Sequence, residues 1–191
     1  LAIHLRASST LLLHAFSDLD WGGNPDALTS TRAFVVFLSS NPVSWCSSKQ
    51  STVARSSIEA EYREIASTAA KVQWITHLSQ EIQFPIHSAP TIYTDKLGAS
   101  YLCANLVFHS WMKHLQLDYH FVCQLVQNHS LCVKYLSAND QLGDALIKPS
   151  GRNHLHSINH RISLLAIPPS LNHIHPPCNS FGSSQTGLIS A

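Results

Sequence analysis

Short apolar segments separated by turn residues fill the first quarter of the chain. Residues 11–17 form an apolar run that ends at Asp18, and residues 33–38 form a second run. Residues 43–46 form a third, after the turn signal at 39–42. Runs of this length, bounded by Gly, Asn, Pro and Ser, are typical of β-strands. Their short links predict an antiparallel meander of three strands.

A helical pattern follows over about residues 56–83. Ser56 and Glu59 have the spacing of an N-terminal capping box. With about 100° per residue, Glu61 lies about 60° from the centre of the apolar stripe, and Glu59 and Glu64 lie about 100–120° from it. Glu61 is therefore the helix acid expected to point inward. The apolar stripe consists of Ile58, Tyr62, Ile65, Ala69 and Val72.

The second half of the chain alternates between strand and helix patterns. Residues 91–94 read as a fourth strand that ends at Asp95, and residues 131–136 as a fifth. Because the fourth strand follows a helix, it is expected to run parallel to the first. Helices are expected at 97–105, 113–127 and 139–147. The pattern as a whole predicts an α/β domain.

The composition changes after Pro149. Ser, Asn, His and Pro become frequent, and the Pro pairs at 168–169 and 176–177 interrupt any regular element. We interpret residues 10–149 as one folded domain and residues 150–191 as a weakly structured tail.

Composition narrows the class of protein. The 191 residues, 45% of them hydrophobic, are enough for one domain with a core, and the net charge of +1 gives no basic footprint for nucleic acid. The five cysteines form no CxxC pair, which favours a reduced protein inside the cell, in the cytoplasm or nucleus. No apolar run is long enough to span a bilayer, so no membrane partner is expected.

Four acidic residues, each in its own segment, are the candidate chemistry. Asp18 and Asp95 follow apolar strands that are expected to be parallel, so they would meet at one edge of a sheet if these strands are neighbours. Glu61 would come from the first helix and Asp144 from the last. A buried carboxylate is costly without a counter-charge, and carboxylate oxygens are ligands for Mg²⁺. The cluster predicts two Mg²⁺ ions, for which Mn²⁺ can substitute, and is typical of nucleases that hydrolyse phosphodiesters.

Other interpretations of these residues stay open. The four acids could be surface or capping residues, and Asp20 is a rival to Asp18 because it lies on the same strand face. Ser17 and Thr94 flank two of the acids and could support them. Lys49, Arg55 and Lys113 are candidate phosphate contacts.

Histidines suggest a zinc site, and tryptophans suggest platforms for stacking bases, but neither interpretation is favoured. His109, His114 and His120 have no partner cysteine at zinc-finger spacing, so packing or capping is expected of the last two. The same lack of a partner cysteine holds for the histidines of the tail. The tryptophans are expected in the core rather than as platforms for stacking bases: Trp21, Trp45 and Trp74.

Seven segments in collinear order carry a family resemblance. They are residues 16–23, 41–50, 52–63, 105–110, 113–114, 118–122 and 140–149. Together they resemble the ribonuclease H domain of Ty1/copia-type retrotransposon Pol polyproteins, over about residues 1–150. The most specific match is 52–63, which contains the stretch Glu-Ala-Glu-Tyr ending at Tyr62.

The resemblance implies a fold, an activity and a site. The fold would be ribonuclease H-like, a five-stranded mixed sheet of three antiparallel plus two parallel strands, flanked by helices. The activity would be metal-dependent hydrolysis of the RNA strand of RNA–DNA hybrids, next to the reverse transcriptase domain of the parent polyprotein. The implied catalytic residues and metal ligands are Asp18, Glu61, Asp95 and Asp144.

Three departures from the family pattern keep a second hypothesis open. Lys96 stands where the family usually has Asn, and residues 27–33 lack a usual glycine and a nearby positive charge. Trp111 and Met112 replace a usual Arg-Thr ahead of Lys113. The alternative is a catalytically inactive remnant that keeps the fold and binds only nucleic acid or a partner. An integrase-type transferase is disfavoured, because Glu61 comes early in the order of the acids.

Overall fold

The computed structural model describes residues 7–8, 11–23, 29–50, 54, 56–104 and 115–147. The tail predicted over 150–191, and the domain boundary at 149, lie outside the described residues. So do Arg55, Lys113 and His114.

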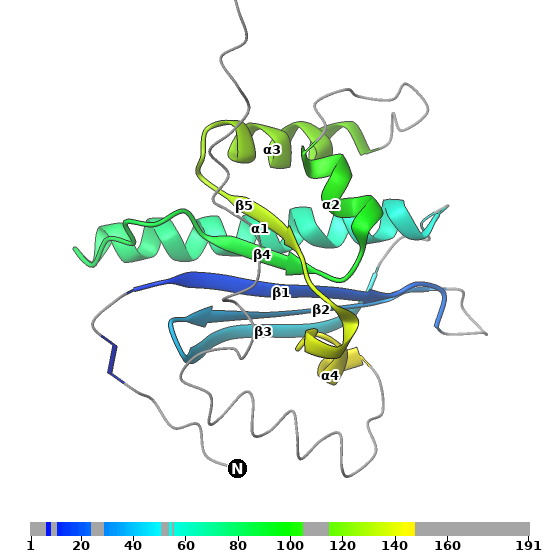
Figure 1. The fold of residues 1–191 in the computed structure, drawn as a ribbon, viewed down its shortest axis with the longest axis horizontal. Helices are drawn as coiled ribbons and strands as arrows, with labels where there is room; N and C mark the ends of the chain where they lie inside the picture. The colour runs from blue at the N-terminus through cyan, green and yellow to red at the C-terminus, as the bar shows by residue number, and fades with distance from the viewer. Residues whose placement is uncertain are drawn as a thin grey trace, which may run out of the picture.

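One mixed sheet of five strands forms the centre of the molecule (Figure 1), in the order β3-β2-β1-β4-β5. The first three strands are antiparallel neighbours, whereas β1–β4 and β4–β5 are parallel pairs. This confirms the predicted fold class and the parallel pairing of the first and fourth strands. The strands are β1 Leu13–Asp20, β2 Thr31–Leu38, β3 Asn41–Lys49, β4 Thr91–Thr94 and β5 Cys132–Tyr135.

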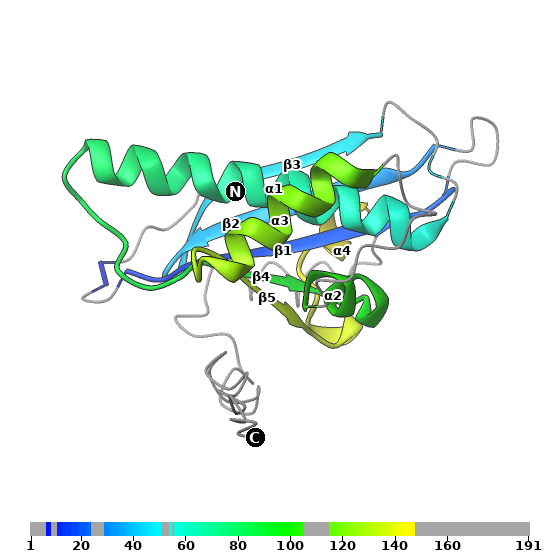
Figure 2. The ribbon, with the colours of Figure 1, turned by 90° about the horizontal axis from the view of Figure 1, so that it is seen from above.

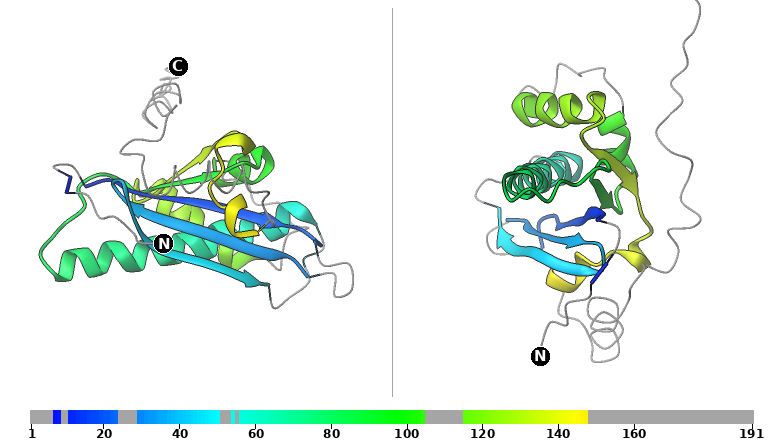
Figure 3. Two further views of the ribbon diagram at one scale, coloured as in Figure 1. Left: turned by 90° about the horizontal axis from the view of Figure 1, so that it is seen from below. Right: turned by 90° about the vertical axis from the view of Figure 1, so that its left-hand side faces the viewer.

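Helices cover both faces of this sheet. The two longer helices α1 and α3 lie on one face, and the short α4 lies on the other, as Figures 2 and 3 show from above, below and the side. The backbone N–H of Glu59 donates to Ser56 Oγ at 3.2 Å, which confirms the predicted N-terminal cap of α1. The helices are α1 Ser57–Glu81, α2 Leu97–Ala104, α3 Gln116–Gln127 and α4 Asp144–Ile147, with a 3₁₀ turn η2 at Ala138–Asp140.

The apolar core is divided by the sheet into two clusters. Side chains alternate between the two faces of a strand, so β1 sends Ala15 toward α1 and Phe16 toward α4. The larger cluster includes Tyr62, Ile65 and Val72 of α1, as the helical pattern predicts. Because β1 has helices on both faces, it is largely apolar on both, and apart from His14 its polar residues lie near its C-terminal end.

Two boundaries differ from the sequence expectation. β1 continues to Asp20, so Asp18 lies inside the strand rather than directly after it. The helix expected over 139–147 is divided into η2 and α4. Gln141, between the two turns, has extended backbone geometry, and its side chain bonds to Ser17 of β1 instead of continuing a helix.

The expectation that the tryptophans are core residues is wrong. Trp21, Trp45 and Trp74 are 51%, 56% and 56% exposed. Trp74 lies on the outer side of α1 with Lys71 Nζ 4.8 Å from its ring centroid. Ile58, assigned to the apolar stripe, is also partly exposed at the first turn of α1.

Candidate functional site

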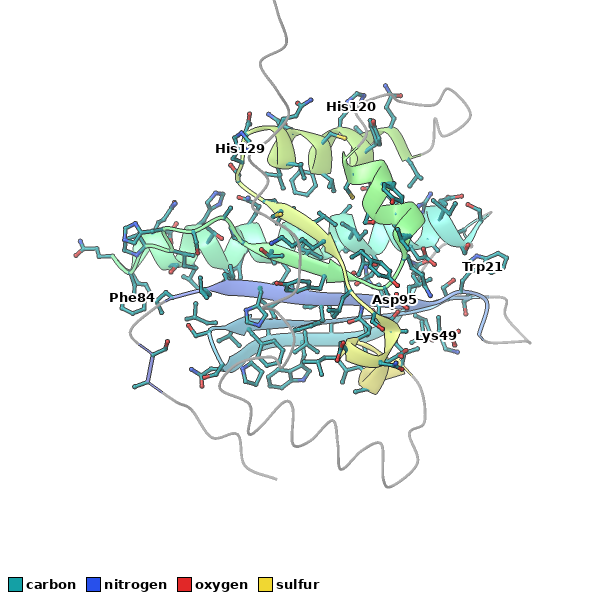
Figure 4. The ribbon with its side chains drawn as sticks, viewed as in Figure 1. Trp21, Lys49, Phe84, Asp95, His120 and His129 are labelled. Atoms are coloured by element: carbon teal, nitrogen blue, oxygen red, sulfur yellow. The ribbon has the colours of Figure 1, made fainter. Side chains whose placement is uncertain are left out.

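Three of the four predicted acids line one pocket. Asp18, Glu61 and Asp95 meet there, beyond the C-terminal end of β4, at the end of the sheet opposite Phe84 (Figure 4). The pocket has an empty volume of about 160 Å³, which includes open solvent. Its other lining residues are Ser17, Leu19, Glu64, Thr94 and Lys96.

The register of the two central strands explains why Asp18 and Asp95 converge. Phe16 of β1 is the parallel partner of Tyr93 of β4. Asp18 and Asp95 each come two residues after this pair, so they lie side by side on neighbouring segments of the sheet. Asp18 is buried, and its Oδ1 accepts a hydrogen bond of 2.8 Å from the backbone N–H of Leu19. The predicted convergence of the first and fourth strand acids is therefore observed.

The two carboxylate oxygens of Asp95 have different surroundings. Its Oδ2 lies 3.1 Å from the Lys96 Nζ atom, whereas its buried Oδ1 has no hydrogen-bond partner. Ser17 and Thr94, the proposed supports, are both buried and line the pocket. Thr94 Oγ1 accepts a hydrogen bond of 3.3 Å from the backbone N–H of Lys96, which ties the turn after β4 to the strand.

Asp144 reaches the cluster from the opposite face of the sheet. It begins α4, and its side chain forms a hydrogen bond with Asp18, although it does not line the pocket itself. Ser47 Oγ donates to the Leu146 carbonyl at 2.8 Å and so holds α4 on β3. The structure thus brings all four predicted acids into one neighbourhood.

Two residues that the sequence did not single out position Asp144. Gln141 Nε2 donates a hydrogen bond of 2.9 Å to the Ser17 carbonyl, and its Oε1 accepts one of 3.2 Å from the Gly143 N–H. A Cβ atom on Gly143 would lie 2.7 Å from Asp18 Cβ. Only glycine leaves room for this backbone to lie against β1. Residues 140–145, DQLGDA, belong to a segment that resembles the family, but no sequence pattern indicated that Gln141 and Gly143 contact β1.

Glu64 is a further acid in the pocket that helix phase placed wrongly. Glu59, Glu61 and Glu64 are all buried, and Glu64 is the most buried of the three, at 1% exposure. Neither Glu64 oxygen has a hydrogen-bond partner, and the Arg32 Nε atom is 3.9 Å from Oε2. The inward direction of Glu61 is correct, but its preference over Glu59 and Glu64 is not reflected in burial, since both of these are more buried than Glu61.

Asp20 does not compete for the pocket. Its carboxylate fills the space beside Gly23, where a Cβ atom on that glycine would collide with it. It is also not among the lining residues. The preference for Asp18 over Asp20 therefore agrees with the geometry.

Burial makes these carboxyl groups weak acids. Desolvation, followed by the Asp144 hydrogen bond and the charges of Asp95 and Asp144, raises the pKa of Asp18 to about 7. Desolvation also raises the pKa of Glu61 to about 7 and that of Glu64 to about 8, against the opposing charges of Lys96 and Arg32 respectively. The pocket therefore favours any added positive charge.

The donor atoms fit a hard divalent cation. Carboxylate oxygens are the ligands that Mg²⁺ prefers, and the unpartnered oxygens of Asp95 and Glu64 are those that a cation could satisfy. As they stand, no group of three His, Cys, Asp or Glu side chains within the described ranges is arranged to hold a metal ion. The positive charge that does lie against the cluster is the Lys96 ammonium group.

Other candidate residues lie away from the pocket or outside the described chain. Lys49 is exposed at the end of β3, and His120 is exposed on α3. Among the described residues, Cys46, Cys103, Cys123 and Cys132 are free thiols. In the part of the chain that the structure describes, no helix has the length and apolar character needed to cross a membrane.

Solved structures with the same arrangement define the class of fold. A ribonuclease H1 isolated from compost superimposes with a TM-score of 0.55, at 11% identity, over 75% of this chain and 98% of its own. The N-terminal ribonuclease H domain of a Mycobacterium tuberculosis protein gives 0.51 at 11% identity, over 79% and 98%. The protein has a ribonuclease H-like fold.

Sequence relatives identify the family. Retrovirus-related Pol polyproteins from transposons RE2 and RE1 of Arabidopsis thaliana are 47% and 46% identical over 88% of this chain. The Pol polyprotein from transposon TNT 1-94 of Nicotiana tabacum is 31% identical over 74% of it. Over most of its length the chain is therefore homologous to a region of the retrovirus-related Pol polyproteins of copia-type transposons, as the motifs predicted. It spans 12% of the length of the two Arabidopsis relatives. No family model matches the chain.

Proposed function

We propose that this chain is a metal-dependent endonuclease that hydrolyses the RNA strand of RNA–DNA hybrids during reverse transcription of a retrotransposon. The observation that carries the proposal is the convergence of Asp18 and Asp95, from adjacent parallel strands, with Glu61 from α1 in one pocket. Asp144 adds a fourth carboxylate through its hydrogen bond with Asp18.

The proposed metal ligands are Asp18, Glu61, Asp95 and Asp144. When bound there, two Mg²⁺ ions supply an activated water and charge stabilisation of the leaving oxygen, and Mn²⁺ can substitute. The four side chains have no nucleophilic role. Ser17 and Thr94 pack beside the acids and keep their backbone in place. Glu61 enters from a helix that is capped and buried, so its direction is set before any ligand binds.

The partners of this activity follow from the family. The substrate would be an RNA–DNA hybrid, and the neighbouring domain would be the reverse transcriptase of the parent polyprotein, inside the cell. The net charge of +1 counts against strong binding of nucleic acid by this chain alone, and a second domain that supplies most of the grip would compensate for it.

The test is cleavage of a labelled RNA–DNA hybrid in Mg²⁺ and then in Mn²⁺. The parent chain is compared with Asp95→Asn, and with Glu81→Gln as a matched control, because Glu81 is an exposed acid at the far end of α1. We expect cleavage by the parent and by Glu81→Gln and none by Asp95→Asn. A folded parent that cleaves in neither metal would overturn the proposal for the isolated chain.

One observation favours the second candidate, an inactive remnant that keeps the fold and binds nucleic acid or a partner. Lys96 Nζ lies 3.1 Å from Asp95 Oδ2, at an oxygen that a metal ion would need. A remnant of this kind would bind the hybrid in a gel-shift experiment but would not cleave it in either metal.

A further inference from the structure

Lys96 enters the carboxylate pocket from a fixed position in the fold. It lies between β4 and α2, and both of its backbone groups are bonded: the N–H donates to Thr94 Oγ1 at 3.3 Å, and the carbonyl accepts from the Ser100 N–H at 3.1 Å. Its side chain is 41% exposed, and the carboxylate of Asp95 is 9% exposed. The ammonium group therefore lies at the mouth of the pocket, over acids that are deeper.

The charges around Lys96 come from three different elements. Its Nζ contacts Asp95 directly, and it also interacts electrostatically with Glu61 of α1 and Asp18 of β1. These are three of the four acids assigned to the metal. The ammonium group is therefore placed where the charges of three acids attract it.

The same oxygens cannot fully serve a lysine and a metal ion. Asp95 Oδ2 is used by Lys96, whereas Oδ1 of the same carboxylate is buried without a partner. The Arg32 guanidinium is engaged elsewhere, because it donates to Ser48 Oγ and Ser67 Oγ and does not line the pocket. A divalent ion entering this pocket must therefore displace the ammonium group or bind beside it.

We infer that Lys96 is a tethered cation that holds the carboxylate pocket together without metal and lowers the affinity of the pocket for divalent ions. The inference rests on the proposed metal site, and it adds a residue that regulates how tightly this site binds a metal ion. The folded protein would not need a metal to keep Asp18, Glu61 and Asp95 close together. Metal binding would require the Lys96 side chain to swing out into solvent, which its partial exposure permits.

The test compares four proteins: the parent, Lys96→Gln, Lys96→Arg and Lys49→Gln. The first variant removes the charge, the second keeps it, and the third removes a lysine charge that is exposed and does not line the pocket. Mn²⁺ binding is measured by electron paramagnetic resonance of the free ion. The melting temperature is measured in EDTA and in Mg²⁺, so that neither measurement depends on nuclease activity.

We expect Lys96→Gln to bind Mn²⁺ about tenfold more tightly than the parent, as for the loss of one competing charge. Its melting temperature should fall in EDTA and recover in Mg²⁺. Lys96→Arg and Lys49→Gln should keep the parental affinity. A rise in affinity in Lys96→Arg equal to that in Lys96→Gln would overturn the inference, because side-chain shape and not charge would then be responsible.

Failure of this inference can be told apart from failure of the proposed function. Equal Mn²⁺ affinity in the parent and Lys96→Gln overturns the role of Lys96 alone, whether or not the hybrid is cleaved. Tighter binding by Lys96→Gln without cleavage by any variant supports the role of Lys96 and contradicts the nuclease. An absence of Mn²⁺ binding in all four proteins overturns both.

Discussion

The side-chain amide of Gln141 donates a hydrogen bond of 2.9 Å to the backbone carbonyl of Ser17. This bond joins the segment before α4 to the middle of β1, one residue away from Asp18. Gln141 is buried, and its Oε1 accepts from the Gly143 N–H. Together with the close approach of Gly143 to β1, this side chain holds Asp144 near Asp18.

Replacing Gln141 should loosen this attachment. We expect Gln141→Ala to lower the free energy of unfolding by about 1–3 kcal/mol, because a buried donor and acceptor lose their partners. Hybrid cleavage should fall further than stability explains, since Asp144 is no longer held against Asp18. Urea unfolding and cleavage assays check both effects. Gln124→Ala on the exposed side of α3 is the matched control and should change neither.

Adding one methyl group at Gly143 should force α4 away from β1. The new Cβ would lie 2.7 Å from Asp18 Cβ, closer than carbon atoms approach without displacement. We expect Gly143→Ala to cost about 1–3 kcal/mol, as for overpacked cores. Gly98→Ala is the control, because its Cβ would meet Ile58 Cδ1 at 3.6 Å, an ordinary contact. Equal stability of the two variants in urea unfolding would contradict the close approach.

The metal-free protein should lose stability as the pH rises from 6.5 to 8. Burial raises the pKa values of Asp18 and Glu61 to about 7 and that of Glu64 to about 8 in the folded chain. Each group therefore contributes stability that is complete below its ordinary value of 3.8 or 4.5 and is lost as the pH passes the raised value.

His14 acts in the opposite sense and in another pH window. Desolvation lowers its pKa from 6.5 to about 4, so its contribution is complete above pH 6.5 and is lost as the pH falls toward 4. The loss of stability above pH 6.5 therefore comes from Asp18, Glu61 and Glu64 and not from His14. Melting temperatures in EDTA should show it, and Mg²⁺ should reduce it. A melting temperature in EDTA that rises over this range would contradict the prediction.

Replacing Glu64 with an apolar residue should stabilise the metal-free protein. Neither of its oxygens has a hydrogen-bond partner, so its ionised form is expensive at high pH. We expect Glu64→Met to raise the free energy of unfolding by about 1–2 kcal/mol above pH 8, and by less at pH 5, where the parent side chain is protonated. Urea unfolding in EDTA measures this. Glu81→Met, at an exposed position of α1, should show no such pH-dependent gain.

Much of the fold could be predicted because strand and helix patterns are local. The apolar runs located all five strands, and the capping box located the start of α1. The burial of Glu64 could not be predicted this way. Helix phase assumes one contact face, but α1 packs against β1, α2 and α3 together, so its buried arc is wider than one apolar stripe.

The sequence located the four acids of the candidate site and the flanking Ser17 and Thr94, but not the contacts made by Gln141 and Gly143. Asp18 and Asp95 follow from two parallel strands, which the chain order already implied. The contact between Gln141 and Ser17 joins residues 124 positions apart, so no local pattern encodes it. The position of Lys96 was visible in the sequence, but whether its ammonium group faced solvent or Asp95 depended on the packing of α2 after β4.

The central place of β1 also has a consequence for synthesis on the ribosome. β1 pairs first with β2, which follows it closely, whereas β4 and α4 arrive much later in the chain. The antiparallel β1–β2–β3 unit can therefore form early, with Asp18 still facing water. Because Asp144 is near the end of the described chain, the four carboxylates come together only after nearly all of this region has left the exit tunnel. The candidate site would thus be assembled later than the meander of β1, β2 and β3 that supplies its first carboxylate.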